Sequence, residues 1–156
     1  TVSSSTIPSA APTGSSLPTL STPTDYASTG VYYHNKHRMN HSAPLTTWNS
    51  AQALIAAEIA SSCIFAHNMT VSGGTYGQNL AAYGSTGAVQ SIPPPLMLAT
   101  SIVNQWYYSE VANFLPSYYG EATPDMSNFA GWGHFSQVVW KGSTSVGCAS
   151  QSCGAG

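Results

Sequence analysis

The chain has 156 residues, of which three are Lys or Arg and five are Asp or Glu. This length suits a single domain with one hydrophobic core, and so few basic residues argue against a surface that binds a nucleic-acid backbone. No apolar run is long enough to span a bilayer, so we expect no membrane-spanning segment.

Residues 1–24 carry no charge and consist mainly of Ser, Thr, Pro and Ala. Such a segment buries too little apolar surface to offset its ordering entropy, so we predict a disordered stalk, open to O-glycosylation, before a folded domain over residues 25–156. The chain lacks an initiator Met and a basic-then-apolar leader, which fits a mature secreted product, although a recombinant boundary would look the same. Sequons at Asn40 and Asn68 predict glycosylation and favour secretion.

The first predicted helix contains the stretch YYHNKHRMNH, which begins at Tyr32. Three histidines and one arginine recur there at the spacing of one helical face. They are His34, His37, Arg38 and His41. Three histidines on one face suggest a metal site, but the neighbouring side chains are equally polar, so a solvated helix is the preferred interpretation.

Two further helices are predicted to build the core. One starts at a cap provided by Asn49 or Ser50 and ends near Cys63, and the other follows the triple proline at 93–95, because proline suits a helix's first turn. Glu110 falls on the apolar stripe of the latter helix, where a carboxylate needs a partner. The inward-facing residues are expected to be Leu54, Ile55, Ile59 and Ser62 in the former helix and Ala99, Ile102, Val103 and Trp106 in the latter.

The stretch GHFSQVVW, from Gly133 to Trp140, is aromatic and β-branched and is predicted to form a short strand. Alternation would place His134, Ser136 and Val138 on one face. From this stretch alone, the imidazole could ligate a metal, move a proton or simply hydrogen bond a backbone carbonyl, and the last is favoured. A further strand is predicted over Val146–Ala149.

Four polar residues are the main candidates for chemistry: His67, Gln78, Glu110 and His134. Two imidazoles and a carboxylate form a common ligand set for zinc. Their spacings are long and irregular, however, and no local metal-binding motif is present. Ser136 lies on the predicted strand face of His134, but nothing identifies it as an activated nucleophile.

Five segments of the chain follow one another in a distinctive order. They are His34-Asn35 with Arg38, Cys63 with His67, the run YGQNLA from Tyr76 to Ala81, Trp106-Tyr107 with Glu110, and GHFSQVVW from Gly133. This order resembles that of the CAP superfamily, which groups cysteine-rich secretory proteins, insect venom antigen 5 and plant pathogenesis-related group-one proteins. The resemblance spans roughly Tyr32 to Cys153, is carried most specifically by the last segment, and is closest to secreted fungal members.

The resemblance implies an α/β fold, a three-layer α-β-α sandwich with a central antiparallel sheet. It also implies a cleft lined by two histidines and two acids, which correspond here to His67, His134 and Glu110. Gln78 takes the position of the second acid. Because an amide has no negative charge and cannot act as a base, we expect a divalent cation, zinc or magnesium, to bind only weakly, and we expect no enzyme.

Similar proteins continue into another cysteine-bearing strand, so the resemblance implies a chain that lacks its last strand. The odd number of cysteines, three, fits this expectation. The disulfide is expected to join Cys63 to Cys148. Cys153 would then be a reactive thiol beside an exposed sheet edge.

Resemblance to fungal members with Ser/Thr-rich stalks implies an extracellular protein that binds a sterol or fatty acid. The residues expected to contact the lipid lie around the start of the third helix: Tyr83, Ile92, Leu96, Met97 and Leu98. Residues 96–98 would serve equally well as helix core. Two alternatives remain, a secreted effector that binds a host or cell-wall protein without lipid cargo, and a metal-dependent hydrolase.

Overall fold

The computed structural model of the protein describes residues 18–84 and 89–154. Its helices and strands are α1 (Tyr26–Asn40), β1 (Thr47–Trp48), α2 (Ser50–Ser61), α3 (Pro94–Thr100), the π-helical η3 (Ser101–Tyr108), α4 (Gly133–Val138) and β2 (Ser145–Val146). Short 3-10 turns connect them: η1 (Val71–Gly74), η2 (Val89–Ser91), η4 (Val111–Asn113), η5 (Pro116–Tyr118) and η6 (Met126–Gly131). Most of the predicted stalk, residues 1–17, lies outside the described residues, and residues 18–24 form neither helix nor strand.

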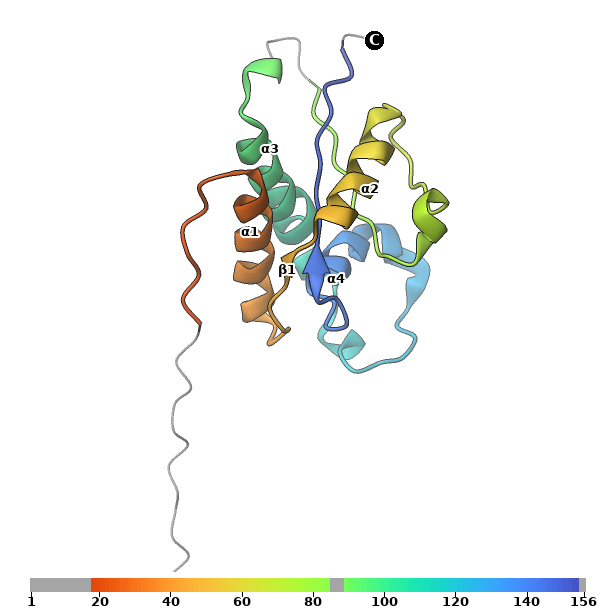
Figure 1. Cartoon of the computed structure of the whole chain (residues 1–156). Helices are drawn as coiled ribbons and strands as arrows, with labels where there is room; N and C mark the ends of the chain where they lie inside the picture. The colour runs from red at the N-terminus through yellow and green to blue at the C-terminus, as the bar shows by residue number, and fades with distance from the viewer. Residues whose placement is uncertain (1–17, 85–88, 155–156) are drawn as a thin grey trace, which may run out of the picture.

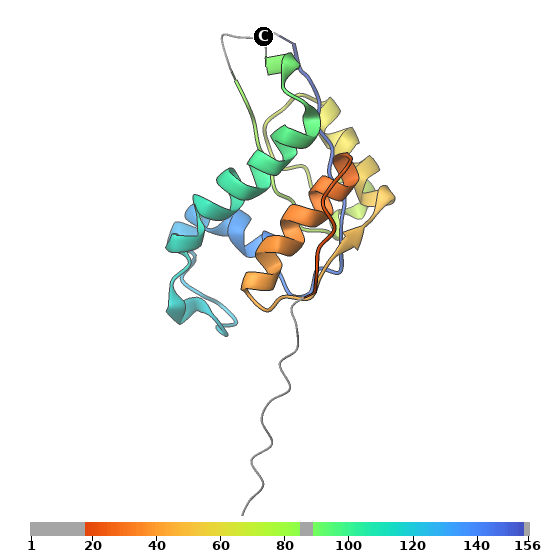
Figure 2. The ribbon, with the colours of Figure 1, turned by 90° about the vertical axis from the view of Figure 1, so that its left-hand side faces the viewer.

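The two strands form a small sheet that lies between helices. Thr47 pairs with Ser145 and Trp48 with Val146, and the strands run parallel. Helices α1 and α3 lie on one side of the pair and α2 on the other (Figures 1 and 2). The predicted α/β class is confirmed, but the antiparallel pairing is wrong for the described strands. A parallel pair needs a long crossover, which the helices from α2 to α4 provide here.

Helix α1 begins at Tyr26, directly after the Asp25 cap, and turns its polar face inward. The Asp25 carboxylate accepts a hydrogen bond from the Ser28 N–H at 2.7 Å, and the Ser28 hydroxyl accepts one from the Asp25 N–H at 3.0 Å, a reciprocal N-terminal cap. His34, His37 and Arg38 are buried. The preferred interpretation of a solvated helix is therefore wrong, because other parts of the chain pack over this face.

Arg38 is the main polar connection between α1 and the rest of the chain. Its side chain is 1% exposed, and its Nε donates to the Pro44 carbonyl at 2.7 Å. Nη1 donates to the carbonyls of Val138 and Trp140 at 3.0 and 2.8 Å, and Nη2 donates to that of Ser143 at 2.8 Å. The guanidinium thus links the turn before β1 to the chain between α4 and β2, and it gives the buried Val138 carbonyl a donor.

A second side chain of α1 fixes the entry to β1. Asn35 is buried, and its Oδ1 accepts hydrogen bonds from the N–H and the hydroxyl of Thr46 at 2.7 and 3.0 Å. Its Nδ2 donates to the Thr46 carbonyl at 2.9 Å. The Asn35 side-chain amide therefore bonds both the N–H and the carbonyl of Thr46, just before β1, as the backbone of a neighbouring strand would.

The apolar core lies between η3 and α4. Ile102 is fully buried, and it packs with Leu98, Trp106 and Val138 in one cluster. The helix predicted after the triple proline is confirmed, although it changes from α to π geometry at Ser101. Its predicted inward stripe is largely confirmed, since the buried residues include Ile102, Trp106 and Glu110.

The segment predicted as a strand at 133–140 is instead the helix α4. The Ser136 N–H donates to the Trp132 carbonyl at 3.0 Å, a helical hydrogen bond. The Phe135 N–H, which lies in the first turn and has no helical partner, donates to the Glu110 carboxylate at 2.9 Å. The local pattern predicted the wrong element because this cap comes from a residue far away in the chain.

Helix α2 contributes less to the core than the sequence predicted. It starts at the Asn49 cap, whose side chain accepts from the N–H groups of Ala51 and Gln52. Ile59 is buried as expected, but Leu54 is 72% exposed. The prediction for Leu54 is therefore wrong, and α2 presents a partly apolar outer surface.

The histidines of α1 do not gather around a metal ion. His34 Nδ1 lies 2.8 Å from a backbone carbonyl one turn earlier, and the ring nitrogens of His41 lie 2.9 and 3.3 Å from the hydroxyls of Tyr107 and Tyr119. Neither ring nitrogen of His37 has a hydrogen-bond partner, and the ring stacks on that of Tyr107 at 3.8 Å. Burial lowers the pKa of His34 and of His37 to about 4.

We predict that replacing Arg38 with Met destabilises the fold by about 3 kcal/mol, because buried carbonyls lose their donor. Arg38→Lys should cost less, since an ammonium group can reach some of the same oxygens. Urea unfolding monitored by circular dichroism measures both changes. Equal stability of the wild type and Arg38→Met would contradict this role for the guanidinium.

We predict that acid destabilises the protein between pH 6.5 and about 4. The unfolded histidines titrate near 6.5, whereas folded His34 and His37 stay neutral until about pH 4, so stability is complete above pH 6.5 and falls as the unfolded state takes up protons. His37→Phe keeps the aromatic stacking and removes one of these groups. Its melting temperature at pH 5 should exceed that of the wild type by about 3 °C, with a smaller difference at pH 8.

Candidate functional site

Two hydrogen-bonded pairs hold the four residues that the sequence singled out. His67 Nδ1 lies 2.7 Å from Gln78 Oε1 in an exposed loop. His134 Nδ1 lies 2.6 Å from the Oε1 of Glu110, which is 6% exposed. Each imidazole is therefore held through Nδ1 by an oxygen acceptor, so each directs Nε2 away from its partner.

The loop that carries Gln78 lies directly against α4. Asn79 Nδ2 donates to the His134 carbonyl at 3.0 Å. A Cβ added to Gly77 would fall 2.0 Å from the side-chain oxygen of Gln137, so the loop approaches α4 closely at this residue. These contacts bring the His67 pair and the His134 pair to the same region of the molecule, although 67 and 134 are far apart in the chain.

Gln78 does more than replace a charged residue with a neutral one. Its Oε1 also accepts from the Asn68 N–H at 3.3 Å, and its Nε2 donates to the Asn68 carbonyl at 3.4 Å. These bonds fix which end of the amide faces His67, so the imidazole donates through Nδ1. A glutamate at 78 could not donate to the Asn68 carbonyl, and the amide therefore suits this loop.

Glu110 has a structural role that occupies both of its oxygens. One oxygen accepts from His134 Nδ1, and the other accepts from the Phe135 N–H at the start of α4. The carboxylate thereby positions the imidazole and caps the helix at the same time. Its buried charge is satisfied by these donors.

The donor atoms of this region do not fit a resident metal ion. Both oxygens of Glu110 and the amide oxygen of Gln78 are already occupied. Across residues 18–84 and 89–154, no group of three or more His, Cys, Asp or Glu side chains is placed to hold a metal. Two imidazole nitrogens remain, fewer than the three protein ligands of a typical catalytic zinc site.

Ser136 does not form a catalytic pair with His134. Since α4 is a helix, residues two apart point to different sides, and the Ser136 hydroxyl donates to the Gly133 carbonyl at 2.8 Å. The shared strand face predicted for these two residues does not exist. The geometry gives no activated serine nucleophile here.

The residues predicted to contact lipid do not share one surface. Leu98 is buried in the core, whereas Leu96 is 57% exposed. The Tyr83 hydroxyl donates to the Met97 carbonyl at 3.1 Å, which ties the preceding segment to α3. The connection at 85–88 lies outside the described residues. Lipid binding by Tyr83, Ile92, Leu96, Met97 and Leu98 stays a prediction.

The disulfide joins Cys63 to Cys153, with 5.6 Å between their Cα atoms. The predicted bond between Cys63 and Cys148 is therefore wrong, as is the prediction of a free Cys153. Cys148 is the free cysteine, and its Sγ would lie 3.6 Å from a Cβ added to Gly30 of α1. The chain runs on from there to the end of α2, where Cys153 meets Cys63.

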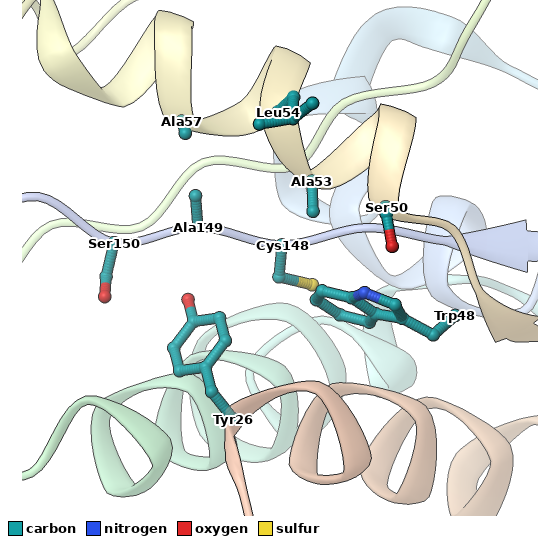
Figure 3. A pocket seen from close by; sticks show the side chains of 9 residues that line it. All are labelled: Tyr26, Trp48, Ser50, Ala53, Leu54, Ala57, Cys148, Ala149 and Ser150. Atoms are coloured by element: carbon teal, nitrogen blue, oxygen red, sulfur yellow. The ribbon is translucent and has the colours of Figure 1, made fainter.

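An apolar groove of about 520 Å³ lies between α1 and α2, along the segment that follows β2. Figure 3 shows side chains of both helices on either side of this segment. The residues that line the groove are Tyr26, Trp48, Ser50, Ala53, Leu54, Ala57, Cys148, Ala149 and Ser150. None of them belongs to the two histidine pairs.

Small side chains create the groove. Ala53 and Ala57 lie one turn apart on the same face of α2, and Ala149 lies on the segment between the helices. This site, and with it the role of the two alanines of α2, was not predicted from the sequence. Their spacing was the available signal, but nothing local showed that this face would meet residues 148–150.

Asn40 and Asn68, the predicted glycosylation sites, are both exposed. Asn68 also forms a tight turn, in which its Oδ1 accepts from the Thr70 N–H and hydroxyl at 3.0 and 2.7 Å. Glycosylation at both positions stays a prediction. Within the described residues, no helix has the length and apolar character needed to cross a membrane.

Comparison with known proteins gives a consistent assignment. The model of the cysteine-rich secretory protein family, CAP, matches residues 31–156. The "Probable pathogenesis-related protein" of Arthroderma benhamiae is 39% identical over 129 residues, which cover 83% of this chain and 38% of that protein. Protein PRY2 of Saccharomyces cerevisiae is 36% identical over 132 residues, covering 83% of this chain and 33% of the relative.

Secreted protein RBT4 of Candida albicans is 31% identical over 130 residues, which cover 83% of this chain and 31% of that protein. The chain thus spans about a third of the length of these curated relatives. No solved structure matches the chain.

We predict that native protein resists iodoacetamide, because burial raises the pKa of the Cys148 thiol to about 12 and so removes the reactive thiolate. After denaturation without reductant, mass spectrometry should find one label, on Cys148. The native rate should be at least about tenfold lower than the denatured rate. A label on Cys153 before reduction would contradict the observed disulfide.

Proposed function

Because the chain belongs to the CAP family of cysteine-rich secretory proteins, we propose that it acts outside the cell as a carrier of a small lipid, a sterol or fatty acid, and not as an enzyme. The groove between α1 and α2 is the observation that carries this proposal. It is a hollow of about 520 Å³, open to solvent, and its lining is mostly apolar, as is typical of small-molecule sites. Its walls combine aromatic and aliphatic side chains with a few hydroxyl groups.

An extracellular location agrees with the chemistry of the chain. The Cys63–Cys153 disulfide joins residues separated by 90 positions, and such bonds persist in oxidising compartments. One relative carries the name Secreted protein RBT4. The exposed sequons at Asn40 and Asn68 are compatible with passage through a secretory pathway.

A role as an interaction protein is the second candidate. Ile64 and Phe65, which directly follow Cys63, are 71% and 68% exposed. Large apolar side chains that are exposed side by side favour a protein partner, such as a host or cell-wall protein. This candidate needs no lipid in the groove.

A metal-dependent hydrolase is the least supported candidate. It would use the imidazoles of His67 and His134, yet Glu110 and Gln78 are occupied by hydrogen bonds within the protein. We propose that zinc or magnesium binds there only weakly, if supplied. The three-layer α-β-α sandwich is likewise proposed for this chain.

The proposal is tested by secreting the protein from a eukaryotic host and analysing co-purified lipid by mass spectrometry. We expect about one sterol or fatty acid per chain, displaced by a labelled competitor and unaffected by EDTA. Ala57→Trp should reduce the bound lipid several-fold, because the indole would fill the groove. Ala112→Trp is the matched control, since Ala112 is also exposed but does not line the groove.

Absence of lipid from the wild type, together with no saturable uptake, would reject the carrier function. Chelator-sensitive turnover of an ester or peptide would support the hydrolase instead. Retention of lipid by Ala57→Trp would place the lipid elsewhere on the domain.

A further inference from the structure

A hydrogen-bonded chain of two tyrosines and one histidine lies where the end of α1 meets η3 and the loop after η5. His41, the C-cap of α1, has its Nε2 2.9 Å from the Tyr107 hydroxyl and its Nδ1 3.3 Å from the Tyr119 hydroxyl. The imidazole therefore has a phenol on each ring nitrogen. None of these three residues belongs to the groove or to the two histidine pairs.

Ring contacts fix the position of Tyr119. Its ring lies parallel to that of His41, with centroids 6.4 Å apart and 8° between the planes, and it meets Phe114 edge to face at 4.9 Å. His41 in turn packs against Phe135 of α4 at 5.0 Å. These contacts hold the phenol beside the imidazole. Tyr119 is nevertheless 53% exposed, so a molecule in solution reaches its ring.

The phenol and the imidazole are both uncharged at neutral pH. Burial lowers the pKa of His41 from its ordinary value, and partial burial together with Tyr107 raises the pKa of Tyr119. A neutral imidazole has one bare nitrogen, and with the ring proton on Nε2 that nitrogen is Nδ1, which faces Tyr119. His41 is then a base within hydrogen-bond reach of a phenol that still has its proton.

This arrangement suits one-electron oxidation of the phenol. Loss of an electron makes a tyrosine hydroxyl strongly acidic, so the reaction is easiest where a base takes the proton as the electron leaves. We propose that Tyr119 is a site of oxidative modification and cross-linking, at which a one-electron oxidant, such as a peroxidase intermediate, accepts the electron and His41 Nδ1 accepts the phenolic proton. The oxidant is thereby reduced by one electron, and the imidazolium returns its proton to water.

The radical formed at Tyr119 then joins that of a second copy of the chain. A carbon–carbon bond forms between the ring positions next to the two hydroxyls, and the hydrogens at those positions move to the two oxygens. Each coupled pair of chains has given up two electrons and two protons, which reduce one hydrogen peroxide to two molecules of water. The inference goes beyond lipid carriage, because it assigns a covalent cross-linking site outside the groove.

Tyr108 offers an internal comparison. It is 63% exposed, more than Tyr119, and it contacts His37 and Tyr107 through its ring, at centroid distances of 5.7 and 5.1 Å. Within the described part of the chain, the hydrogen bonds between imidazole and phenol join His41 to Tyr107 and Tyr119 and leave out Tyr108. Exposure alone therefore favours oxidation of Tyr108, whereas a neighbouring base favours oxidation of Tyr119.

The test oxidises the full chain at pH 7.5 with photogenerated tris(bipyridine)ruthenium(III), a small oxidant that takes an electron but no proton. Mass spectrometry of peptides locates the modified tyrosines, and Tyr119 should react at least about tenfold faster than Tyr108. His41→Gln keeps a hydrogen-bonding group but supplies no base, so it should slow Tyr119 about tenfold and leave Tyr108 unchanged. Thermal unfolding checks that the variant retains the fold.

The wild type gives a second readout, which needs no substitution at His41. Tyr108 passes its proton to water or to a buffer base, so its rate should rise with phosphate concentration, whereas the rate at Tyr119 should not change. With peroxidase and hydrogen peroxide, a covalent dimer linked through Tyr119 should form. Tyr119→Phe should abolish this dimer, and Tyr108→Phe, the matched control, should retain it.

The outcomes that contradict the inference are distinct. A rate at Tyr108 equal to or above that at Tyr119 overturns it, since exposure would then decide the reaction. Full reactivity of Tyr119 in His41→Gln, or the same dependence on phosphate at both tyrosines, overturns the role of His41 as the base. Oxidation of Tyr119 without a dimer linked through it overturns the cross-linking step. None of these outcomes bears on lipid binding in the groove.

Discussion

The fold depends most on one buried cation that has backbone carbonyls for partners. The Arg38 guanidinium donates to Pro44 just before β1 and to Val138, Trp140 and Ser143 just before β2. Of these four carbonyls, that of Val138 is buried and would lack a donor without Arg38, at a cost of about 1–3 kcal/mol, and the other three are partly buried. By satisfying them together, one side chain brings the two chain segments to the same side of α1, and the parallel strands then lie next to each other.

The two histidine pairs also depend on side chains that have more than one hydrogen-bond partner. Glu110 caps the first turn of α4 and holds His134, so one carboxylate serves the fold and the candidate site at once. Gln78 similarly anchors the Asn68 backbone and holds His67. Each of these two side chains thus serves the fold and holds an imidazole at the same time. The two histidine pairs therefore form a polar junction between a loop and a helix.

The groove has the opposite character. It exists because α2 presents Ala53 and Ala57 towards residues 148–150, and small side chains leave space that larger ones would fill. The groove differs from the two histidine pairs in its chemistry. This difference matters for function, because an apolar ligand is stabilised by the exclusion of water and needs no charged partner. Substitutions in one region therefore need not affect the other, and lipid binding in the groove would not require a metal ion at the histidine pairs.

By itself, the sequence determined the family, the α/β class and the Asn49 helix cap, and it singled out the four residues of the two histidine pairs. These follow from local chemistry, such as capping spacing, or from a motif order that survives without a structure. Only the tertiary structure decided that Gly133–Val138 is helical, that Cys153 and not Cys148 pairs with Cys63, and that Leu54 faces outward. Each of these depends on a partner distant in the chain. Helix α4 depends on the Glu110 cap, and Cys153 depends on the end of α2. The orientation of α2, with Ala53 and Ala57 towards residues 148–150, depends on the segment after β2. Local patterns carry no information about such partners, because the stabilising contacts join residues that are far apart in the sequence and close only in the folded chain.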